Sequence, residues 1–183
     1  MSTNQALLVM DFQAEVVPRL GDRAPAILAN AATALEKARA AGMTVIHVVV
    51  GFRTGYPEVS PRNKSFSAIA STGALVVTVP GANIAREVAP RPEEPIIIKH
   101  RVNAFAGTDL DMILRARGIT KLALCGIATS GVVLSTLRHA ADADYELVVL
   151  RDACADMDEE VHRVLVEKVF PRQATVIEVA AFS

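Results

Sequence analysis

The chain has 183 residues, of which 51% are hydrophobic, and its formal net charge is −1. This length suits one domain with a core of its own, and this hydrophobic content excludes a disordered chain. The balanced charge, without a basic stripe interleaved with aromatic residues, argues against nucleic acid as the main partner. Two cysteines outside any CxxC pair do not make a disulfide framework, and neither a signal peptide nor an apolar run of ~18 residues is present. We therefore expect a cytoplasmic protein that does not enter membranes.

Short apolar runs alternate with helical patterns along the chain. In chain order we expect strands at 6–10, 43–50, 95–98, 122–125, 146–150 and 174–179, and helices at 25–41, 109–117, 130–143 and 158–169. Several runs are apolar on consecutive positions, which is typical of strands buried on both faces of a parallel sheet. We predict an α/β fold: a Rossmann-like, three-layer doubly wound sandwich with a six-stranded, mainly parallel sheet, in a single domain over residues 1–183.

Residues 51–94 interrupt this alternation. Together with Pro95 they hold six of the nine prolines, and they contain one short expected helix at 64–71. Long loops in a compact domain often form pocket walls or oligomer contacts. We expect one of these roles for this segment.

Polar or unusual residues follow three of the expected strands. Asp11 follows the first, Lys99 follows the third, and the turn at 126–132 follows the fourth. Ligands of open parallel sheets bind beyond the carboxyl ends of the strands, so these features are expected to converge. Taken singly, each has a simpler interpretation: Asp11 as the cap of a turn, and Lys99 as a solvated amine.

Three motifs in these regions point to one family. They are LLVMDFQ at 7–13, IKHRVNAFAGTDL at 98–110 and GIAT at 126–129, followed by TLRHA at 136–140, DY at 144–145 and DA at 152–153. In order and spacing they resemble the isochorismatase-like hydrolases of the cysteine hydrolase superfamily, which include nicotinamidases and carbamoylsarcosine-amidase-like enzymes. The resemblance covers roughly residues 6–180 and implies the α/β fold of that family.

The resemblance also implies a catalytic set of Asp, Lys and Cys. It would make Asp11 the acid/base and Lys99 its charged partner, with the turn at Ile127, Ala128 and Thr129 holding an oxyanion. Family members often have a non-proline cis peptide in this turn, which here would join Ile127 to Ala128. The thiol would lie at the start of the next helix, where the helix N-terminus and the ammonium favour the thiolate.

The nucleophile position departs from the family pattern. Val132 stands six residues after Gly126, where the family has its Cys, and a valine cannot form a thioester. Ser130 is expected to start the helix, and Cys125 is expected to be a small buried residue inside a strand. Cys154 lies near another strand end. Whether Ser130 or Cys154 replaces the missing nucleophile stays open.

The sequence favours neither a metal nor another cofactor. Residues 48–53 lack the Asp-x-His of nicotinamidase-like members, and the four histidines have no ligand spacing. The pocket-lining residues that we expect are Phe12, Arg53, Phe105 and Ser130, with Tyr56 and Phe66 as further candidates. Arg53 would bind a substrate carboxylate, or else lie in a surface or dimer contact.

Two functions fit these observations. The first is a hydrolase that acts on a small-molecule substrate through Asp11 and Lys99 without thioester chemistry, since relatives acting on enol ethers such as isochorismate depend more on an acid–base Asp. The second is a non-catalytic small-molecule-binding protein or oligomeric scaffold of the same fold. A buried charge pair costs desolvation energy, so a fold with no use for Asp11 and Lys99 would tolerate apolar replacements, and their presence favours the hydrolase. Val132 at the nucleophile position favours the binding protein.

By the resemblance we also expect a homo-oligomer, a dimer or higher. Candidates for its contacts are the loops at 51–94 and the helix around Val133, Leu134 and Leu137, although these residues could instead simply cover the sheet.

Overall fold

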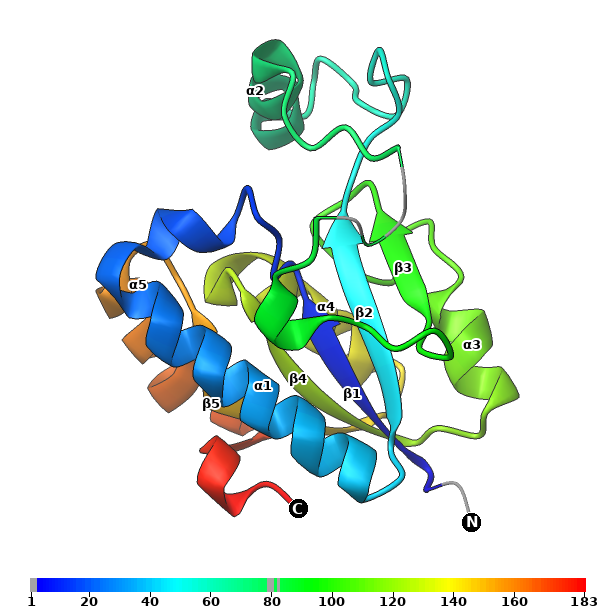
Figure 1. Ribbon diagram of the computed structural model, residues 1–183, viewed down its shortest axis with the longest axis vertical. Coiled ribbons are helices and arrows are strands. Elements are labelled where there is room, and N and C mark those ends of the chain that lie inside the picture. Colours follow the sequence, from blue (N-terminus) through cyan, green and yellow to red (C-terminus); the bar gives the residue numbers. More distant parts are fainter. Residues whose placement is uncertain (1–2, 79–80, 82) are drawn as a thin grey trace.

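The computed structural model describes residues 3–78, 81 and 83–183. Its centre is a six-stranded sheet in the order β3-β2-β1-β4-β5-β6 (Figure 1). The strands are β1 (Gln5–Met10), β2 (Thr44–Val50), β3 (Ile96–Lys99), β4 (Lys121–Ile127), β5 (Glu146–Ala155) and β6 (Thr175–Ile177). All five strand pairs are parallel, which confirms the predicted α/β sheet.

The central strands are buried on both faces, as their consecutive apolar residues predict. Every residue of β2 is buried, and so is every residue of β1 and β4 after the first. β5 differs from the expectation, because it continues five residues past Leu150. The register with β4 shifts between Leu124 and Gly126, where Arg151 is exposed. β5 is buried again from Ala153, and Cys154 pairs with Gly126.

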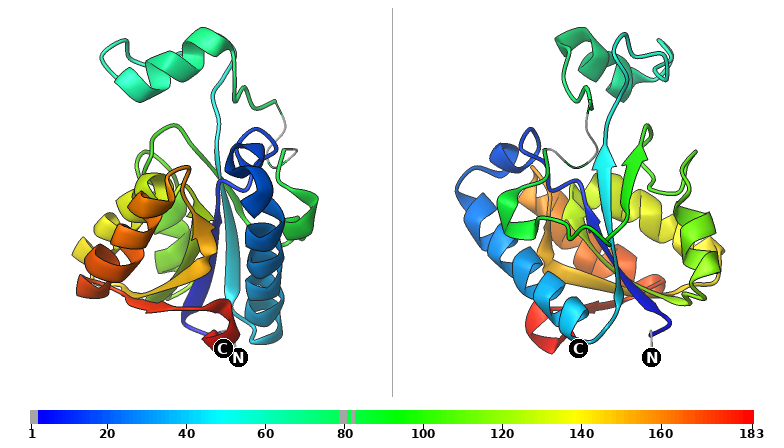
Figure 2. Two further views of the ribbon diagram at one scale, coloured as in Figure 1. Left: turned by 90° about the vertical axis from the view of Figure 1, so that its left-hand side faces the viewer. Right: turned by 45° about the vertical axis from the view of Figure 1, so that its right-hand side comes forward.

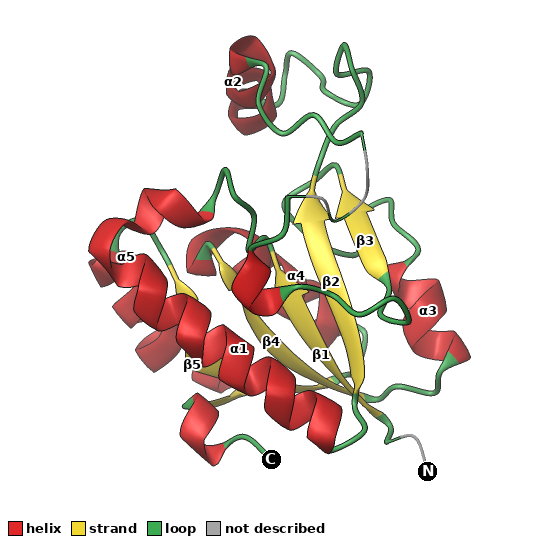
Figure 3. Ribbon diagram, in the orientation of Figure 1, coloured by secondary structure: helices red, strands yellow, loops and turns green. Residues whose placement is uncertain are grey.

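Helices cover both faces of the sheet, so the molecule has three layers (Figures 2 and 3). The regular helices are α1 (Ala24–Ala40), α2 (Lys64–Thr72), α3 (Leu110–Ala116), α4 (Leu134–Asp142) and α5 (Glu159–Val164). Shorter or irregular turns are η1 (Val17–Arg23), η2 (Arg86–Val88), η3 (Thr129–Val133), η4 (Leu165–Val169), η5 (Phe170–Arg172) and η6 (Val179–Ala181). α1 packs on one face, and α3, α4 and α5 pack on the other. None of the helices in the described ranges is long and apolar enough to span a membrane.

The direction of winding reverses between two neighbouring strands. From β1 the chain moves outward through β2 to β3, whereas from β4 it moves the other way through β5 to β6. The reversal lies between β1 and β4. These strands pair in register, from Gln5 opposite Lys121 to Met10 opposite Gly126. A doubly wound sheet opens a crevice at the carboxyl ends of such strands. The fold therefore places Asp11, directly after β1, beside the turn that follows β4.

Residues 51–77, called the arm below, project beyond the carboxyl ends of β2 and β3 and carry α2 (Figure 1). A small apolar cluster, separate from the main core, joins Phe52, Phe66 and Leu75 of the arm to Val50 at the end of β2. The Phe52 ring meets the Phe66 ring edge-on, with centroids 5.4 Å apart. This packing gives the arm internal order although it lies away from the sheet.

Candidate functional site

Asp11 and Lys99 meet in a buried ion pair at the carboxyl edge of the sheet. The Lys99 Nζ lies 2.9 Å from Asp11 Oδ2, and the two side chains are only 3% and 8% exposed. Lys99 ends β3 and pairs in register with Val50 of β2, while the Asp11 amide donates to the Val48 carbonyl of the same strand. β2 thus holds both residues in place. The predicted convergence of these two side chains is confirmed.

The Asp11 backbone adopts a left-handed conformation, with φ of 59°. Asp and Asn are the non-glycine residues that tolerate this region best. The turn brings Gln13 against β2, where its side-chain amide donates to the Val50 carbonyl at 2.9 Å and accepts from the Val50 amide at 2.8 Å. Gln13 therefore fixes the end of β2 next to the ion pair.

One oxygen of the Asp11 carboxylate is left without a donor. Oδ2 faces Lys99, but no described residue donates to the buried Oδ1. Burial raises the pKa of Asp11, and the Lys99 ammonium together with the Val50 backbone only partly opposes this. A carboxyl group with a raised pKa and one free oxygen is suited to give or take a proton.

The turn after β4 has the expected backbone but an apolar side chain at its tip. The Ile127–Ala128 peptide is cis, as the resemblance implied. The chain then enters η3, which has a non-helical backbone at Gly131. Val132 lies in η3 and is 2% exposed. An aliphatic group therefore stands where the resemblance places a thiol.

Two side chains that the sequence analysis did not single out fix this turn. Asp156, directly after β5, accepts from the Ser130 amide at 2.7 Å. The Thr129 hydroxyl lies 2.8 Å from Nδ1 of His162 in α5, and burial lowers the pKa of that histidine. The position of Asp156 at a strand end was a usable signal. His162 had none, because only the docking of α5 brings it to the turn.

The remaining candidates lie in different places. Phe12 is buried, and Phe105 stacks on His139 of α4 with ring centroids 4.4 Å apart. The Arg53 guanidinium is exposed and pairs with Glu58 at 2.6 Å, while Tyr56 donates to the Ala74 carbonyl inside the arm. Phe66 belongs to the apolar cluster of the arm, and Ser130 is exposed at the start of η3.

Neither native cysteine is placed as a nucleophile. Cys125 and Cys154 are both free and buried within strands. Burial raises the pKa of the Cys154 thiol to about 12 and raises that of Cys125 well above its ordinary value. Both thiols are therefore protonated at neutral pH, which leaves them unreactive.

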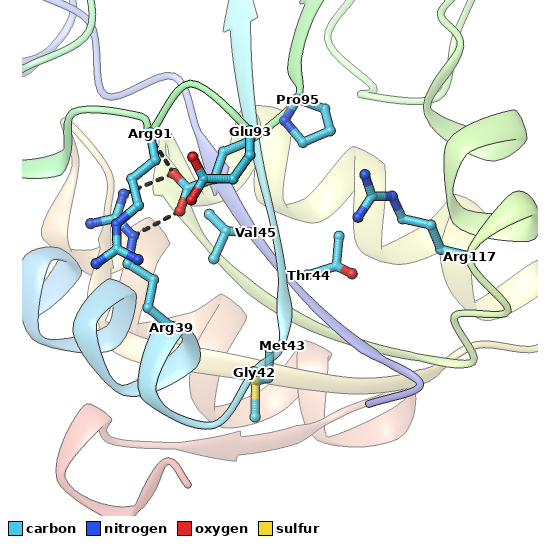
Figure 4. Close-up of a pocket in the computed structure, with 10 residues that line it drawn as sticks. Arg39, Gly42, Met43, Thr44, Val45, Arg91, Glu93, Pro95 and Arg117 are labelled. Carbon is cyan, nitrogen blue, oxygen red and sulfur yellow. Dashed lines mark hydrogen bonds and ion pairs between the residues drawn. The ribbon is translucent and has the colours of Figure 1, made fainter. Parts of the chain in front are cut away.

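Acidic, histidine and cysteine side chains are not clustered for metal binding: among the described residues, no group of three or more could hold a metal ion. A hollow of about 250 Å³ lies at the other end of the strands from the ion pair, beside the start of β2 (Figure 4). Arg39 lies on one side of β2 there and Arg117 on the other. Glu94 binds Arg39 through two hydrogen bonds of 2.7 and 2.8 Å and lies 3.0 Å from His47, so its carboxylate is already occupied. This hollow contains none of the residues of the ion pair.

Comparisons with known proteins agree on one family. The sequence model described as the isochorismatase domain matches residues 5–181. The uncharacterized isochorismatase family protein YecD of Escherichia coli O157:H7 is 33% identical over 93% of this chain and 90% of its own. The ureidoacrylate amidohydrolase RutB of Stutzerimonas stutzeri is 32% identical over 99% of this chain and 78% of its own. The crystal structure of an isochorismatase family protein from Desulfovibrio vulgaris has a TM-score of 0.83 at 29% identity, covering 97% of this chain and 95% of that one.

Proposed function

The chain belongs to the isochorismatase-like hydrolase family, and from this premise we propose that it hydrolyses a small molecule by acid–base chemistry at Asp11, without a covalent thioester. Lys99 serves as the charged partner of Asp11. Val132 replaces the nucleophile with an apolar group at the edge of the site. The observation that carries this proposal is the buried ion pair, in which Asp11 keeps one oxygen without a donor.

The geometry supports a proton-transfer role for Asp11. Its Oδ1 is the free atom from which a proton would pass to a leaving group, or to which water would give one. Lys99 holds the carboxyl in position through Oδ2, and its ammonium also donates to the Arg101 carbonyl at 3.2 Å. A bond whose cleavage is helped mainly by protonation, such as that of an enol ether, suits a site without a nucleophile.

The turn after β4 would bind the reacting oxygen. We assign this role to the backbone of Ile127, Ala128 and Thr129, and we assign Phe12, Arg53, Phe105 and Ser130 to substrate binding. Hydrogen bonds to Asp156 and His162 hold the turn in a fixed shape. A fixed shape is what oxyanion binding needs, because the donors must not reorganise during the reaction.

The second candidate function is binding without catalysis. One observation favours it: Val132 fills the nucleophile position with a side chain that is 2% exposed. In that case a small molecule would bind in the crevice beside Asp11, and Asp11 would act only as a hydrogen-bonding group. The two functions differ in whether loss of the Asp11 carboxylate abolishes turnover or only weakens binding.

A hydrolase screen over esters, amides and enol ethers tests the proposal. It compares the wild type with Asp11→Asn, which keeps the size and the left-handed backbone. Asp144→Asn is the matched control, because Asp144 also has positive φ (63°) but is exposed, two residues before the start of β5. We expect Asp11→Asn to lower kcat by about 100-fold or more, since general acid–base groups contribute ~10²–10⁴. Asp144→Asn should have wild-type activity.

Equal turnover in the wild type and Asp11→Asn would overturn the catalytic proposal. Saturable binding of a screened compound, with no turnover by any of the three proteins, would establish the binding function in its place. Circular dichroism of each variant separates loss of chemistry from loss of fold.

We also propose that the protein is a cytoplasmic homo-oligomer, with the arm as part of the contact. The projection of the arm from the sheet supports this role. Of the helix residues expected at the contact, Val133 and Leu137 are fully buried within the protomer and cover the sheet, and Leu134 is partly buried against the core. Light scattering coupled to gel filtration measures the subunit number, and a monomer at micromolar concentration would refute the proposal.

A further inference from the structure

The hollow at the start of β2 lies at the amino ends of the strands, away from the crevice beside Asp11 (Figure 4). Its volume of about 250 Å³ is below the ~300–1,000 Å³ of pockets that hold drug-sized ligands, so it suits a smaller molecule. Ligands of open parallel sheets normally bind at the carboxyl ends of the strands. A ligand in this hollow would therefore be distinct from the proposed substrate.

Val45, which lines the hollow, brings an unpaired backbone N–H and C=O to it. The residues of β2 alternate in direction, and the His47 amide donates to the Pro95 carbonyl, so the backbone of Val45 also faces the β3 side. β3 begins at Ile96, opposite His47. The next donor of this ladder would be residue 95, which is a proline and has no N–H. None of the described residues forms a hydrogen bond with the Val45 N–H or C=O on this side.

These two backbone groups set what a ligand must offer. Val45 is only 4% exposed, and a buried backbone donor or acceptor without a partner costs free energy, which a ligand would recover. The ligand must accept from the N–H with one atom and donate to the C=O with another. An α-amino acid that lies antiparallel to β2 has both atoms in place, because paired antiparallel residues exchange two hydrogen bonds through their own N–H and C=O.

Charged groups of the hollow fit the two ends of an amino acid. Arg39 and Glu94 satisfy each other through two hydrogen bonds. Arg117 directly follows α3, and its side chain points toward β2 below Pro95 (Figure 4). Glu93 lies in the turn before Pro95 and is exposed. Within the described part of the chain, neither Arg117 nor Glu93 forms a salt bridge or a side-chain hydrogen bond, so a cation and an anion stay available.

The order of these groups along β2 sets the direction of the ligand. Within Val45 the N–H precedes the C=O, so the C=O lies nearer to Pro95 and Glu93. An antiparallel amino acid therefore has its ammonium toward Glu93. Its carboxylate then faces the Val45 N–H, toward Thr44, and Arg117 lies on the same side of β2 as the Thr44 side chain (Figure 4). The charges of the hollow thus match those of the ligand at both ends.

We propose that this hollow binds a free α-amino acid in its zwitterionic form. The Val45 backbone pairs with the amino acid as it would with a strand residue. Glu93 accepts from the ammonium, and Arg117 binds the carboxylate. This binding involves neither Asp11 nor Lys99, so it is a second function of the molecule and does not depend on the proposed hydrolysis.

Calorimetric titration of the full-length protein at about pH 7 tests the proposal with three probes. L-alanine has both charged ends, propionate lacks the ammonium, and L-alaninamide lacks the carboxylate. We expect L-alanine to bind saturably. Propionate and L-alaninamide should each bind about 10-fold or more weakly, because each loses a charge-assisted hydrogen bond.

Amide signals in a nuclear magnetic resonance titration place the ligand. The amide signal of Val45 should shift as L-alanine is added, since its N–H gains an acceptor. The amide of Val49 is the matched control, because it faces the same side of β2 but lies within the ladder with β3. Its signal should stay in place, and so should that of Asp11.

Pro95→Ala supplies the backbone N–H that the ladder lacks. This N–H can pair with the Val45 carbonyl and so compete with the ammonium of the ligand. L-alanine should then bind about 10-fold more weakly. Pro61→Ala, at an exposed proline of the arm, is the control and should leave the affinity unchanged.

Arg117→Met removes the cation assigned to the carboxylate. It should bring the affinity ratio of L-alanine to L-alaninamide close to one. Arg115→Met is the matched control, because Arg115 lies in the neighbouring helix α3 but pairs with Asp111 at 2.9 Å. This variant should keep the ratio of the wild type.

Equal affinity of the wild type for L-alanine and propionate would refute the proposal, and so would an absence of saturable L-alanine binding or an unmoved Val45 signal. N-acetylalanine N-methylamide has the same side chain within a peptide segment; tighter binding of this compound than of L-alanine would assign the hollow to a peptide strand instead. If Pro95→Ala does not fold, the three probes and the Val45 signal decide. Asp11→Asn should bind L-alanine as the wild type does, whatever its turnover.

Discussion

Lys99→Met probes how strongly the Asp11–Lys99 pair is desolvated. Methionine keeps the length of the side chain but removes the ammonium that lies 2.9 Å from Asp11 Oδ2. Because the two side chains are 3% and 8% exposed, loss of one partner leaves a buried carboxylate unpaired. Such a change costs about 3–5 kcal/mol of unfolding free energy. We expect a loss in this range at pH 8, measured by urea denaturation.

The loss should shrink at lower pH. Burial already raises the pKa of Asp11 above 3.8, and Lys99 is the main group that opposes this, so its removal raises the pKa further. A carboxyl group whose folded pKa is raised stabilises the fold below its unfolded pKa, and this stabilisation is lost as the pH rises through the folded value. The variant should therefore gain stability relative to the wild type, by up to about 1.4 kcal/mol per pH unit, as the pH falls from 8 toward 5.

Lys121→Met is a control at nearly the same ion-pair distance. Lys121 lies 2.8 Å from Glu146, but these side chains are 31% and 69% exposed. A surface pair of this kind contributes about 0.5 kcal/mol, with little dependence on pH in this range. The contrary result is that Lys99→Met lowers the unfolding free energy no more than Lys121→Met does, with the same flat dependence of that loss on pH. In that case the Asp11–Lys99 pair is not desolvated, and the reasoning fails.

Three further predictions follow from single side chains. Val132→Cys should place a thiol in η3, directly before α4, where the helix N-terminus favours the thiolate, so it should react with iodoacetamide at neutral pH although Val132 is only 2% exposed. The two native thiols lie within strands and have raised pKa values, and mass spectrometry showing no label beyond the wild-type level would contradict the prediction. Gly126→Ala should destabilise the fold by about 2 kcal/mol in thermal unfolding, because its Cβ would lie 2.8 Å from the Met10 carbonyl oxygen and 2.9 Å from the Met10 Cβ. Glu94, with its pKa lowered to about 2, should stabilise the fold above pH 4.5 and lose this effect as the pH falls toward 2; a stability difference from Glu94→Gln that stays constant over this range would count against it.

Most of the fold is predictable from hydrophobic pattern alone. Strands buried on both faces are continuous apolar runs, and 44–50 is the plainest case. The pattern fails where tertiary pairing overrides it. Arg151 and Asp152 make β5 look finished at Leu150, but the register shift against β4 carries the strand on to Ala155.

The ion pair is predictable for a topological reason. Parallel strands have their carboxyl ends on the same side of the sheet, so Asp11, directly after β1, and Lys99, the last residue of β3, approach each other across β2. His162 is different, because no local pattern marks it. Its position depends on how α5 docks, which periodicity does not encode.

The backbone of Asp11 bears on whether the pair exists for folding or for function. A left-handed turn after β1 needs only a residue that tolerates a φ of 59°, and glycine or asparagine would meet that need without a charge. Without the carboxylate, Lys99 would have no reason to be buried at the end of β3. Desolvation of both groups is a cost that the turn does not require, and apolar replacement of such pairs is often neutral or stabilising. The turn alone therefore does not account for the carboxylate, which supports the proposed role of its free Oδ1 toward a ligand.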